Sequence, residues 1–152
     1  MQLSANFSLE QLTASDTAAA RGIDNAPPPE IIDNLRQLAA GLEQAQALLG
    51  YPLSISSGYR SPALNVAVGG AEKSQHCTGI AADFTCPGFG TPLDIAAALR
   101  DSGLRFDQCI LEFGRWVHLS FSAEPRGRLL TIHDSKEGYL VGLWDTEGNK
   151  VG

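Results

Sequence analysis

The sequence predicts one α+β domain, in which helices lie before and between the strands of a small antiparallel sheet. Apolar residues recur every three or four positions over 30–49, as in an amphipathic helix. The pattern changes to alternation over 53–59, and apolar runs at 108–112 and 116–121 flank a glycine turn, as in a β-hairpin. Because 152 residues is near the usual size of one domain, we expect a single domain over 1–152.

Residues 1–50 are expected to be mainly helical. Ser8, followed three positions later by Gln11, forms a capping-box pattern that predicts a short helix. The prolines at 27–29 interrupt the chain and suit the first turn of a new helix. That helix is predicted over Glu30–Leu49, and Gly50 is expected to end it.

Residues 51–125 are expected to form the core that carries the sequence motifs. The runs 53–59 and 79–85 are predicted to be strands that precede the hairpin described above. Ser61–Asn65 and 91–102 are predicted to be helices between these strands.

The C-terminal tail, 126–152, has weaker patterning. Gly138 and the run Glu147-Gly148-Asn149 are turn signals within it. We therefore expect the tail to add another β-hairpin.

The charge distribution limits the classes of partner. The formal net charge is −6, and the basic residues are scattered singly rather than clustered. Binding to phosphates needs clustered Lys and Arg, so we expect no nucleic-acid partner. No apolar run reaches the roughly 18 residues of a transmembrane helix, so we expect no membrane partner. Met1–Gln11 lacks the pattern of a secretory signal, which predicts synthesis in the cytoplasm. We also expect the protein to be a monomer.

Three cysteines, Cys77, Cys86 and Cys109, form an odd set that does not suggest a fully paired disulfide framework. One pair remains able to bridge, but reduced thiols fit a cytoplasmic product better. We expect all three to be free, and we expect Cys77 to pack in the core on the face of a strand opposite to that of its neighbour His76.

Two of the three histidines lie in contexts that fit a metal site. His76 stands near the start of the predicted strand 79–85, Asp83 follows on that strand, and His118 lies in the predicted hairpin. A catalytic zinc site uses three N or O ligands and leaves one position open for water. A histidine among apolar residues is more often part of the core, so spacing alone leaves both interpretations open. His133, in the tail, is expected to be a surface histidine.

Three motifs raise the weight of the metal interpretation. They are SGYRSP at 57–62, SQHCTGIAAD at 74–83 and EFGRWVHLSF at 112–121. Together they resemble the M15-type, D-Ala-D-Ala carboxypeptidase-like zinc peptidases, small enzymes of bacteria and phages that act on peptidoglycan. The second motif matches the family's S-x-H-x-x-G-x-A-x-D pattern, and Trp116–His118 matches its W-V-H element. The resemblance covers about Phe7 to Phe121.

The resemblance implies a role for each matched residue. One Zn²⁺ per chain would be held by three ligands, His76, Asp83 and His118. Arg60 corresponds to the family arginine that faces the substrate carbonyl or carboxylate, where a fixed guanidinium stabilises an oxyanion. Ser74 and Gln75 either bind substrate or orient His76.

The general base is the one departure from the family pattern. Many relatives carry Glu three residues before the last histidine ligand, and this chain has Arg115 there. The nearest carboxylate is Glu112, which is the expected base. A three-residue hairpin loop puts Glu112 and His118 on the same side of the hairpin, whereas a two-residue loop puts them on opposite sides.

The resemblance implies zinc-dependent hydrolysis of peptide bonds in peptidoglycan stem peptides, by a carboxypeptidase or an endopeptidase. The expected setting is the cell wall, after release of a phage or prophage product. The alternative is a catalytically inactive domain that binds peptidoglycan or belongs to a virion and keeps the fold. The departure at Arg115 favours this alternative, and the retention of all three expected ligands disfavours it.

Overall fold

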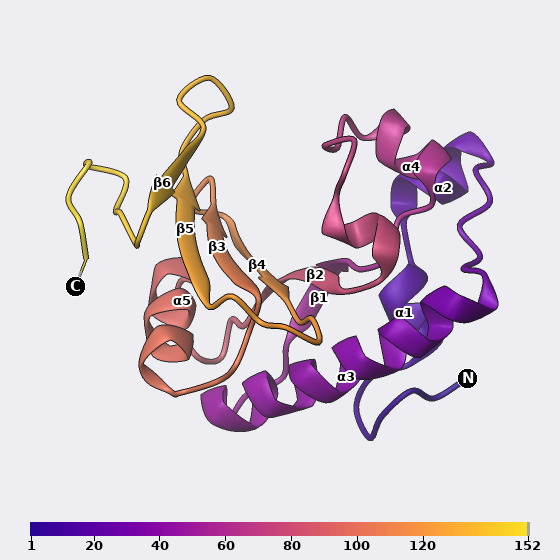
Figure 1. The fold of residues 1–152 in the computed structure, drawn as a ribbon, viewed down its shortest axis with the longest axis horizontal. Coiled ribbons are helices and arrows are strands. Elements are labelled where there is room, and N and C mark those ends of the chain that lie inside the picture. The colour runs from indigo at the N-terminus through magenta and orange to yellow at the C-terminus, as the bar shows by residue number, and fades with distance from the viewer. Residues whose placement is uncertain (152) are drawn as a thin grey trace.

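A six-stranded sheet forms the centre of the molecule in the computed structural model, which describes residues 1–151 (Figure 1). Its strands are β1 (Ser54–Ser57), β2 (Ala81–Thr85), β3 (Gln108–Glu112), β4 (Trp116–Ser120), β5 (Arg128–Ile132) and β6 (Tyr139–Val141). Their order in the sheet is β1-β2-β4-β3-β5-β6. Neighbours are antiparallel except for β3 and β5, which are parallel. The predicted α+β class is therefore confirmed, and the sheet is mostly rather than wholly antiparallel.

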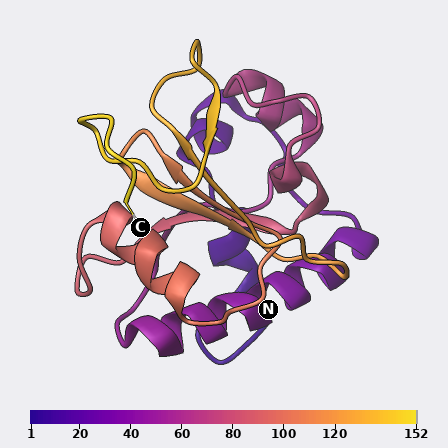
Figure 2. The same cartoon turned by 60° about the vertical axis from the view of Figure 1, so that its left-hand side comes forward.

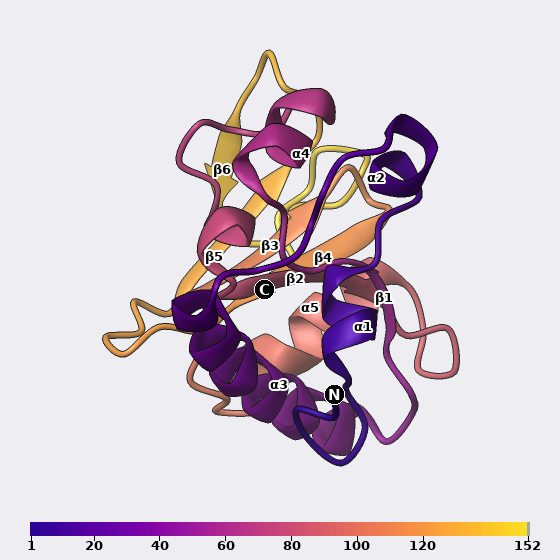
Figure 3. The same cartoon turned by 90° about the vertical axis from the view of Figure 1, so that its right-hand side faces the viewer.

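The helices lie on both sides of this sheet. They are α1 (Leu9–Thr13), α2 (Asp16–Arg21), α3 (Pro29–Leu49), α4 (Pro62–Ala67), the 3₁₀ helix η1 (Gln75–Thr78) and α5 (Pro92–Asp101). Figure 3 shows α1, α3 and α5 below the sheet and α2 and α4 above it. The main hydrophobic core lies between the sheet and the helices of the lower face, while α2 and α4 lie over the upper face.

The helix ends follow the local signals in the sequence. Ser8 caps α1 with the full capping box, in which its hydroxyl accepts from Gln11 N and the Gln11 side chain accepts from Ser8 N. Gly50 ends α3 with φ of 76°, a conformation that a glycine adopts without strain. Both predicted helices are confirmed. Helix α2 is not predicted by the sequence pattern, because a helix of 6 residues is too short to show a period.

Alternation along the central strands separates the core from the upper face. Ala82, Phe84, Val117 and Leu119 are fully buried against the helices. Asp83, between the first two of these residues, therefore points to the upper face, as does His118 between the other two.

Two predictions about the segment before β2 are wrong. The strand begins at Ala81, and residues 75–78 form η1 instead of extended chain. Because His76 and Cys77 are neighbours on a 3₁₀ helix, they do not point to opposite faces of a strand, and Cys77 is half-buried rather than packed in the core. The prediction that all three cysteines are free is confirmed.

The tail extends the sheet beyond β3. After β4 the chain crosses to the far side of β3, which makes β5 parallel to β3, and β6 then pairs antiparallel with β5. Gly138, with φ of 74°, precedes β6 at the end of the connecting loop, and Figure 2 shows this hairpin projecting away from α3. Among residues 1–151, no helix is both long and apolar enough to cross a bilayer.

The long helix α3 offers a matched test of the core. We expect Leu38→Ala to lower the free energy of unfolding by about 2–5 kcal/mol, because Leu38 is fully buried and its removal leaves a cavity. Leu48→Ala is the control on the same helix, since Leu48 is 49% exposed, and it should change stability by less than about 0.5 kcal/mol. Urea denaturation measures both, and equal losses would contradict this assignment of the buried face.

Candidate metal centre

Strand pairing brings the predicted metal ligands together. In the antiparallel register of β2 and β4, Asp83 lies directly opposite His118. Side chains opposite one another on one face of a sheet have Cβ atoms about 4.5–5.5 Å apart, so an aspartate and a histidine there come into contact. His76 reaches the same point from η1, which lies next to β2.

These side chains lie at the base of a cleft of about 820 Å³ on the upper face of the sheet. One wall comes from α2 and the segment from α4 to η1, and the other from β3, the hairpin turn and the β5–β6 hairpin. The predicted site residues Arg60, Ser74, Gln75 and Glu112 all line this cleft. It is large enough for a ligand of several residues.

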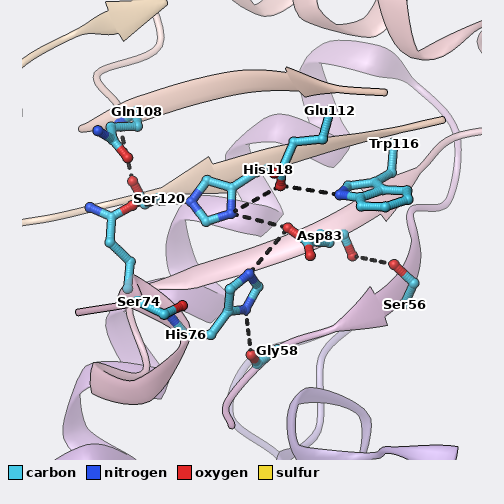
Figure 4. A network of polar contacts seen from close by, with 11 residues as sticks. Ser56, Gly58, Ser74, His76, Asp83, Gln108, Glu112, Trp116, His118 and Ser120 are labelled. Carbon is cyan, nitrogen blue, oxygen red and sulfur yellow. Dashed lines mark hydrogen bonds and ion pairs between the residues drawn. The ribbon is translucent and has the colours of Figure 1, made fainter. Parts of the chain in front are cut away.

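His76 is held in one tautomer by the backbone. Its Nδ1 lies 2.7 Å from the carbonyl oxygen of Gly58, and a carbonyl can only accept a hydrogen bond. Nδ1 therefore carries the proton and donates it to Gly58. The other ring nitrogen, Nε2, carries no proton and faces Asp83 (Figure 4), so it is able to bind a cation.

Two glycines of the motifs make this arrangement sterically possible. A side chain on Gly58 would overlap the Leu12 carbonyl group, which accepts from Tyr59 N at 2.7 Å. Gly79, with φ of 73°, ends η1 and donates to the carbonyl oxygen of His76, and a Cβ there would lie 2.9 Å from Ile31. A side chain at position 58 would therefore displace the Gly58 carbonyl that holds His76, and a side chain at position 79 would displace η1.

His118 is held in the opposite tautomer. Its Nε2 lies 3.1 Å from Gln75 Oε1, and the amide nitrogen of Gln75 donates to Asp107 Oδ2 at 2.8 Å. Because a carboxylate only accepts, the amide group must point its nitrogen at Asp107 and its oxygen at His118. Nε2 of His118 then carries the proton, and Nδ1 is free to bind a cation.

The free nitrogens of both histidines meet the same carboxylate oxygen. Asp83 Oδ1 lies 3.2 Å from His76 Nε2 and 3.1 Å from His118 Nδ1. Burial by itself raises the pKa of Asp83, but the adjacent His118 and His76 imidazoles outweigh it and hold that pKa well below its usual range, so Asp83 is a carboxylate that can only accept. If both histidines are neutral, three atoms with lone pairs converge with no proton between them, which is unfavourable unless a cation lies there.

The group therefore fits a metal ion. One ligand atom from each of His76, Asp83 and His118 lies within 4.8 Å of the others, and all three residues are buried. Two neutral imidazole nitrogens and one carboxylate oxygen are ligands that divalent transition metals accept, and three ligands leave a coordination position open toward the cleft.

Glu112 lies beside this group on the same face. The pairing of Glu112 with Trp116 leaves a loop of three residues, 113–115, so Glu112 and His118 point to the same side. Glu112 Oε1 lies 3.7 Å from His118 Nδ1 and accepts from Trp116 Nε1 at 3.2 Å. Burial, followed by repulsion from Asp83, raises the pKa of Glu112.

Arg115, at the position where many relatives carry the glutamate, has no contact with the cleft. It lies in the turn of the hairpin, is exposed, and is not among the residues that line the cleft. The turn has positive φ at Phe113 and Gly114, 58° and 66°, and Arg115 N donates to Glu112 O. The Arg115 side chain therefore projects from the turn, whereas Glu112 is still on β3 and lines the cleft.

Arg60 is half-buried in the cleft wall. Its backbone N donates to His76 O at 3.1 Å, which joins the end of the SGYRSP motif to η1. Its Nε is buried and has no hydrogen-bond partner among the described residues. Gly70 packs against the guanidinium, since a Cβ there would lie 2.8 Å from Arg60 Nη1. The guanidinium is therefore enclosed while retaining unused donor capacity.

Ser74 and Gln75 have protein partners. Ser74 caps η1 by accepting from His76 N, which positions the backbone of that histidine. Gln75 contacts His118 rather than His76. A direct contact of either residue with substrate stays a prediction.

Three further residues near the site are not indicated by the sequence motifs. Asp107 holds Gln75, and Arg126 in turn holds Asp107 through hydrogen bonds of 2.9 and 2.8 Å. Tyr139, on β6, lines the cleft, and burial together with Glu112 and Asp83 raises the pKa of its phenol. An aspartate directly before the apolar run 108–112 was a usable signal, but Arg126 and Tyr139 lie in the weakly patterned tail.

His133, expected on the surface, is half-buried and is not part of the metal-binding group.

Comparison with known proteins agrees with this geometry. The family model described as Peptidase M15 matches residues 5–120, which include all three candidate ligands, Arg60 and Glu112. No match was found among curated proteins. The family match spans more than half of the 152 residues. The chain therefore belongs to the M15 peptidase family, and its buried His-Asp-His group is the candidate metal site of that peptidase fold.

Proposed function

We propose that this protein is a zinc-dependent hydrolase that cuts peptide bonds in the stem peptides of peptidoglycan. The observation that carries the proposal is the convergence of His76 Nε2 and His118 Nδ1 on Asp83, at the base of an open cleft. A domain that only bound peptidoglycan would have no need for two histidines locked with their free nitrogens facing one carboxylate.

Zinc is the proposed metal because of the ligand set. Two imidazoles and one carboxylate leave a divalent ion with a net charge of +1 and an open coordination position, the pattern of catalytic zinc sites. When bound there, the ion would polarise the scissile carbonyl and lower the pKa of water to about 7. The protein's contribution is to hold the three ligands in fixed tautomers and positions before the ion arrives.

Glu112 is the proposed general base. It accepts the proton of the attacking water and delivers it to the leaving amine nitrogen. Its position supports this role, since Oε1 lies 3.7 Å from His118 Nδ1 and the side chain is 16% exposed at the cleft.

Arg60 is the proposed substrate-binding cation. Its place in the cleft wall fits a cation that donates to a carbonyl or carboxylate oxygen of the substrate. Once the carbonyl carbon is attacked, a fixed guanidinium stabilises the negative charge that develops on the oxygen. Ser74 and Gln75 support the site by positioning its histidines.

The substrate class rests on the family resemblance and on the shape of the cleft. Stem peptides are short, contain D-amino acids and carry free carboxylates, and a cleft of about 820 Å³ with Arg60 in its wall can take such a peptide. We propose a monomer that acts on the cell wall after release from the cytoplasm, without nucleic-acid or membrane partners.

His118→Ala tests the metal and the activity together. We expect zinc affinity to fall by at least about 100-fold, since loss of a ligand should exceed the 10–100-fold effect typical of residues behind the ligands. Hydrolysis of purified peptidoglycan should be lost in parallel. Zinc titration and release of peptide amines measure the two effects.

His133→Ala is the matched control, because His133 is the one histidine outside the metal-binding group, and it should leave both properties unchanged. Wild-type protein that binds zinc but cleaves neither peptidoglycan nor stem peptides would favour the inactive binding domain. Absence of zinc binding in the wild type would sink the proposal.

Glu112→Gln separates proton transfer from metal binding. We expect the cleavage rate to fall by about 10²–10⁴-fold, because the amide cannot accept a proton, while zinc affinity stays near the wild-type value. Glu147→Gln, at an exposed position in the tail, is the control and should retain full activity. A Glu112→Gln variant with wild-type turnover would assign the base to another group.

A further inference from the structure

A chain of polar contacts runs from His118 away from the cleft to the C-terminal tail. Gln75 lies between His118 and Asp107, with its oxygen 3.1 Å from His118 Nε2 and its nitrogen 2.8 Å from Asp107 Oδ2. Arg126 forms a two-point contact with Asp107, through Nε to Oδ1 at 2.9 Å and Nη2 to Oδ2 at 2.8 Å. The backbone N of Arg126 also donates to Asp107 Oδ1, at 3.1 Å.

Asp107 is fixed as an anion at the centre of this chain. Its side chain is 4% exposed, and its two oxygens together accept four hydrogen bonds, from Gln75 and Arg126. The hydrogen bonds from Arg126 hold the pKa of Asp107 well below its usual range, so the group has no proton to donate. Its oxygens can only accept, which decides the orientation of any amide that contacts it.

The orientation of the Gln75 amide decides which ring nitrogen of His118 carries the proton. With its nitrogen pointed at Asp107, the Gln75 amide presents its oxygen to His118, and His118 must donate from Nε2. Were the amide turned around, its NH₂ would face Nε2, and the imidazole would carry its proton on Nδ1. The nitrogen that faces Asp83 would then be unable to bind a cation.

We propose that Asp107 and Arg126 are positioning residues that act through Gln75 to keep Nδ1 of His118 unprotonated and directed at the metal. Asp107 sets the orientation of the Gln75 amide, and Arg126 neutralises and immobilises the Asp107 carboxylate. The proposal rests on the metal site of the proposed function and is independent of which peptide is cut.

Arg126 connects the polar contacts around His118 to the C-terminal tail. The family match ends at residue 120, so Arg126 lies in the segment that connects β4 to β5, outside the matched part. Through Arg126, the tail contributes to metal affinity, although it supplies none of the ligands.

A purely structural role makes different predictions. Arg128 N donates to the Asp107 carbonyl and Gly127 N to Phe106 O, so the same segment also closes the crossover between β4 and β5. If the ion pair of Asp107 and Arg126 only held this crossover, its loss would lower the stability of the protein without changing zinc affinity. Zinc affinity measured on folded protein therefore distinguishes the two roles.

The experiment is a double-mutant cycle in which zinc affinity is measured by competition with a chromogenic chelator. We expect Gln75→Leu to weaken zinc binding by about 10–100-fold and Arg126→Ala by about 10-fold, as is typical for residues that orient metal ligands. In the Gln75→Leu background, Arg126→Ala should have no further effect, because its influence passes through Gln75. Because the Arg126 side chain is 51% exposed, we expect the Arg126→Ala variant to fold normally.

Arg100→Ala is the matched control. Arg100 also pairs with an aspartate, Asp101, with an N–O distance of 2.9 Å, but it lies on α5, outside the residues that line the cleft. Its loss should leave zinc affinity unchanged. Equal zinc affinity in wild type and Gln75→Leu, or additive effects of the two variants, would overturn the proposal. Failure of the wild type itself to bind zinc would instead sink the proposed function.

The tautomer is open to direct observation in the wild type, without any variant. In ¹⁵N-histidine-labelled protein loaded with zinc, the His118 ring should show a protonated Nε2 and a metal-bound Nδ1, and Arg126→Ala should broaden or shift the Nε2–H signal. A ring protonated at Nδ1 would contradict the proposed chain.

Discussion

The antiparallel pairing of β2 with β4 is the constraint on which the rest of the site depends. The register places Asp83 opposite His118, and strand alternation turns both away from the helices, while Ala82, Phe84, Val117 and Leu119 are buried beneath them. A slip of one residue would exchange the two faces and leave charged side chains in the core. The hydrophobic core therefore fixes the register of the candidate metal-binding residues. Each further group is added to this pair: His76 from η1, and Glu112 from the neighbouring strand.

Electrostatics explains why the arrangement suits a cation. The carbonyl of Gly58 fixes the proton on one side of His76, and the oxygen of Gln75 does the same for His118, so both free nitrogens face Asp83. Such a convergence of lone pairs is costly without a positive charge, which is why locked tautomers are more informative than distance alone. The candidate site is ordered by groups that are not themselves candidate ligands, and those groups come from segments far apart in the sequence.

Much of this structure was predictable because its signals are local. Capping at Ser8, the glycine after α3, the alternation over 53–59 and the apolar runs of the hairpin each report on nearby residues, and the three motifs name the candidate ligands. The 3₁₀ helix at 75–78 escaped prediction because four residues show no period, and this is why Cys77 was misplaced. The parallel pairing of β3 with β5 and the contact of Arg126 with Asp107 depend on a crossover that no local pattern specifies. The hairpin loop could only be resolved by its pairing, which puts Arg115 in the turn and Glu112 on the strand.

The most direct measurement of the central claim is a crystal structure of the protein with zinc, with anomalous scattering recorded on both sides of the zinc absorption edge. The account predicts a single strong peak among His76 Nε2, His118 Nδ1 and a carboxylate oxygen of Asp83, at about 2.0–2.2 Å from each, with an open side toward the cleft. A peak elsewhere, a fourth protein ligand that closes the site, or coordination through Nε2 of His118 would contradict it.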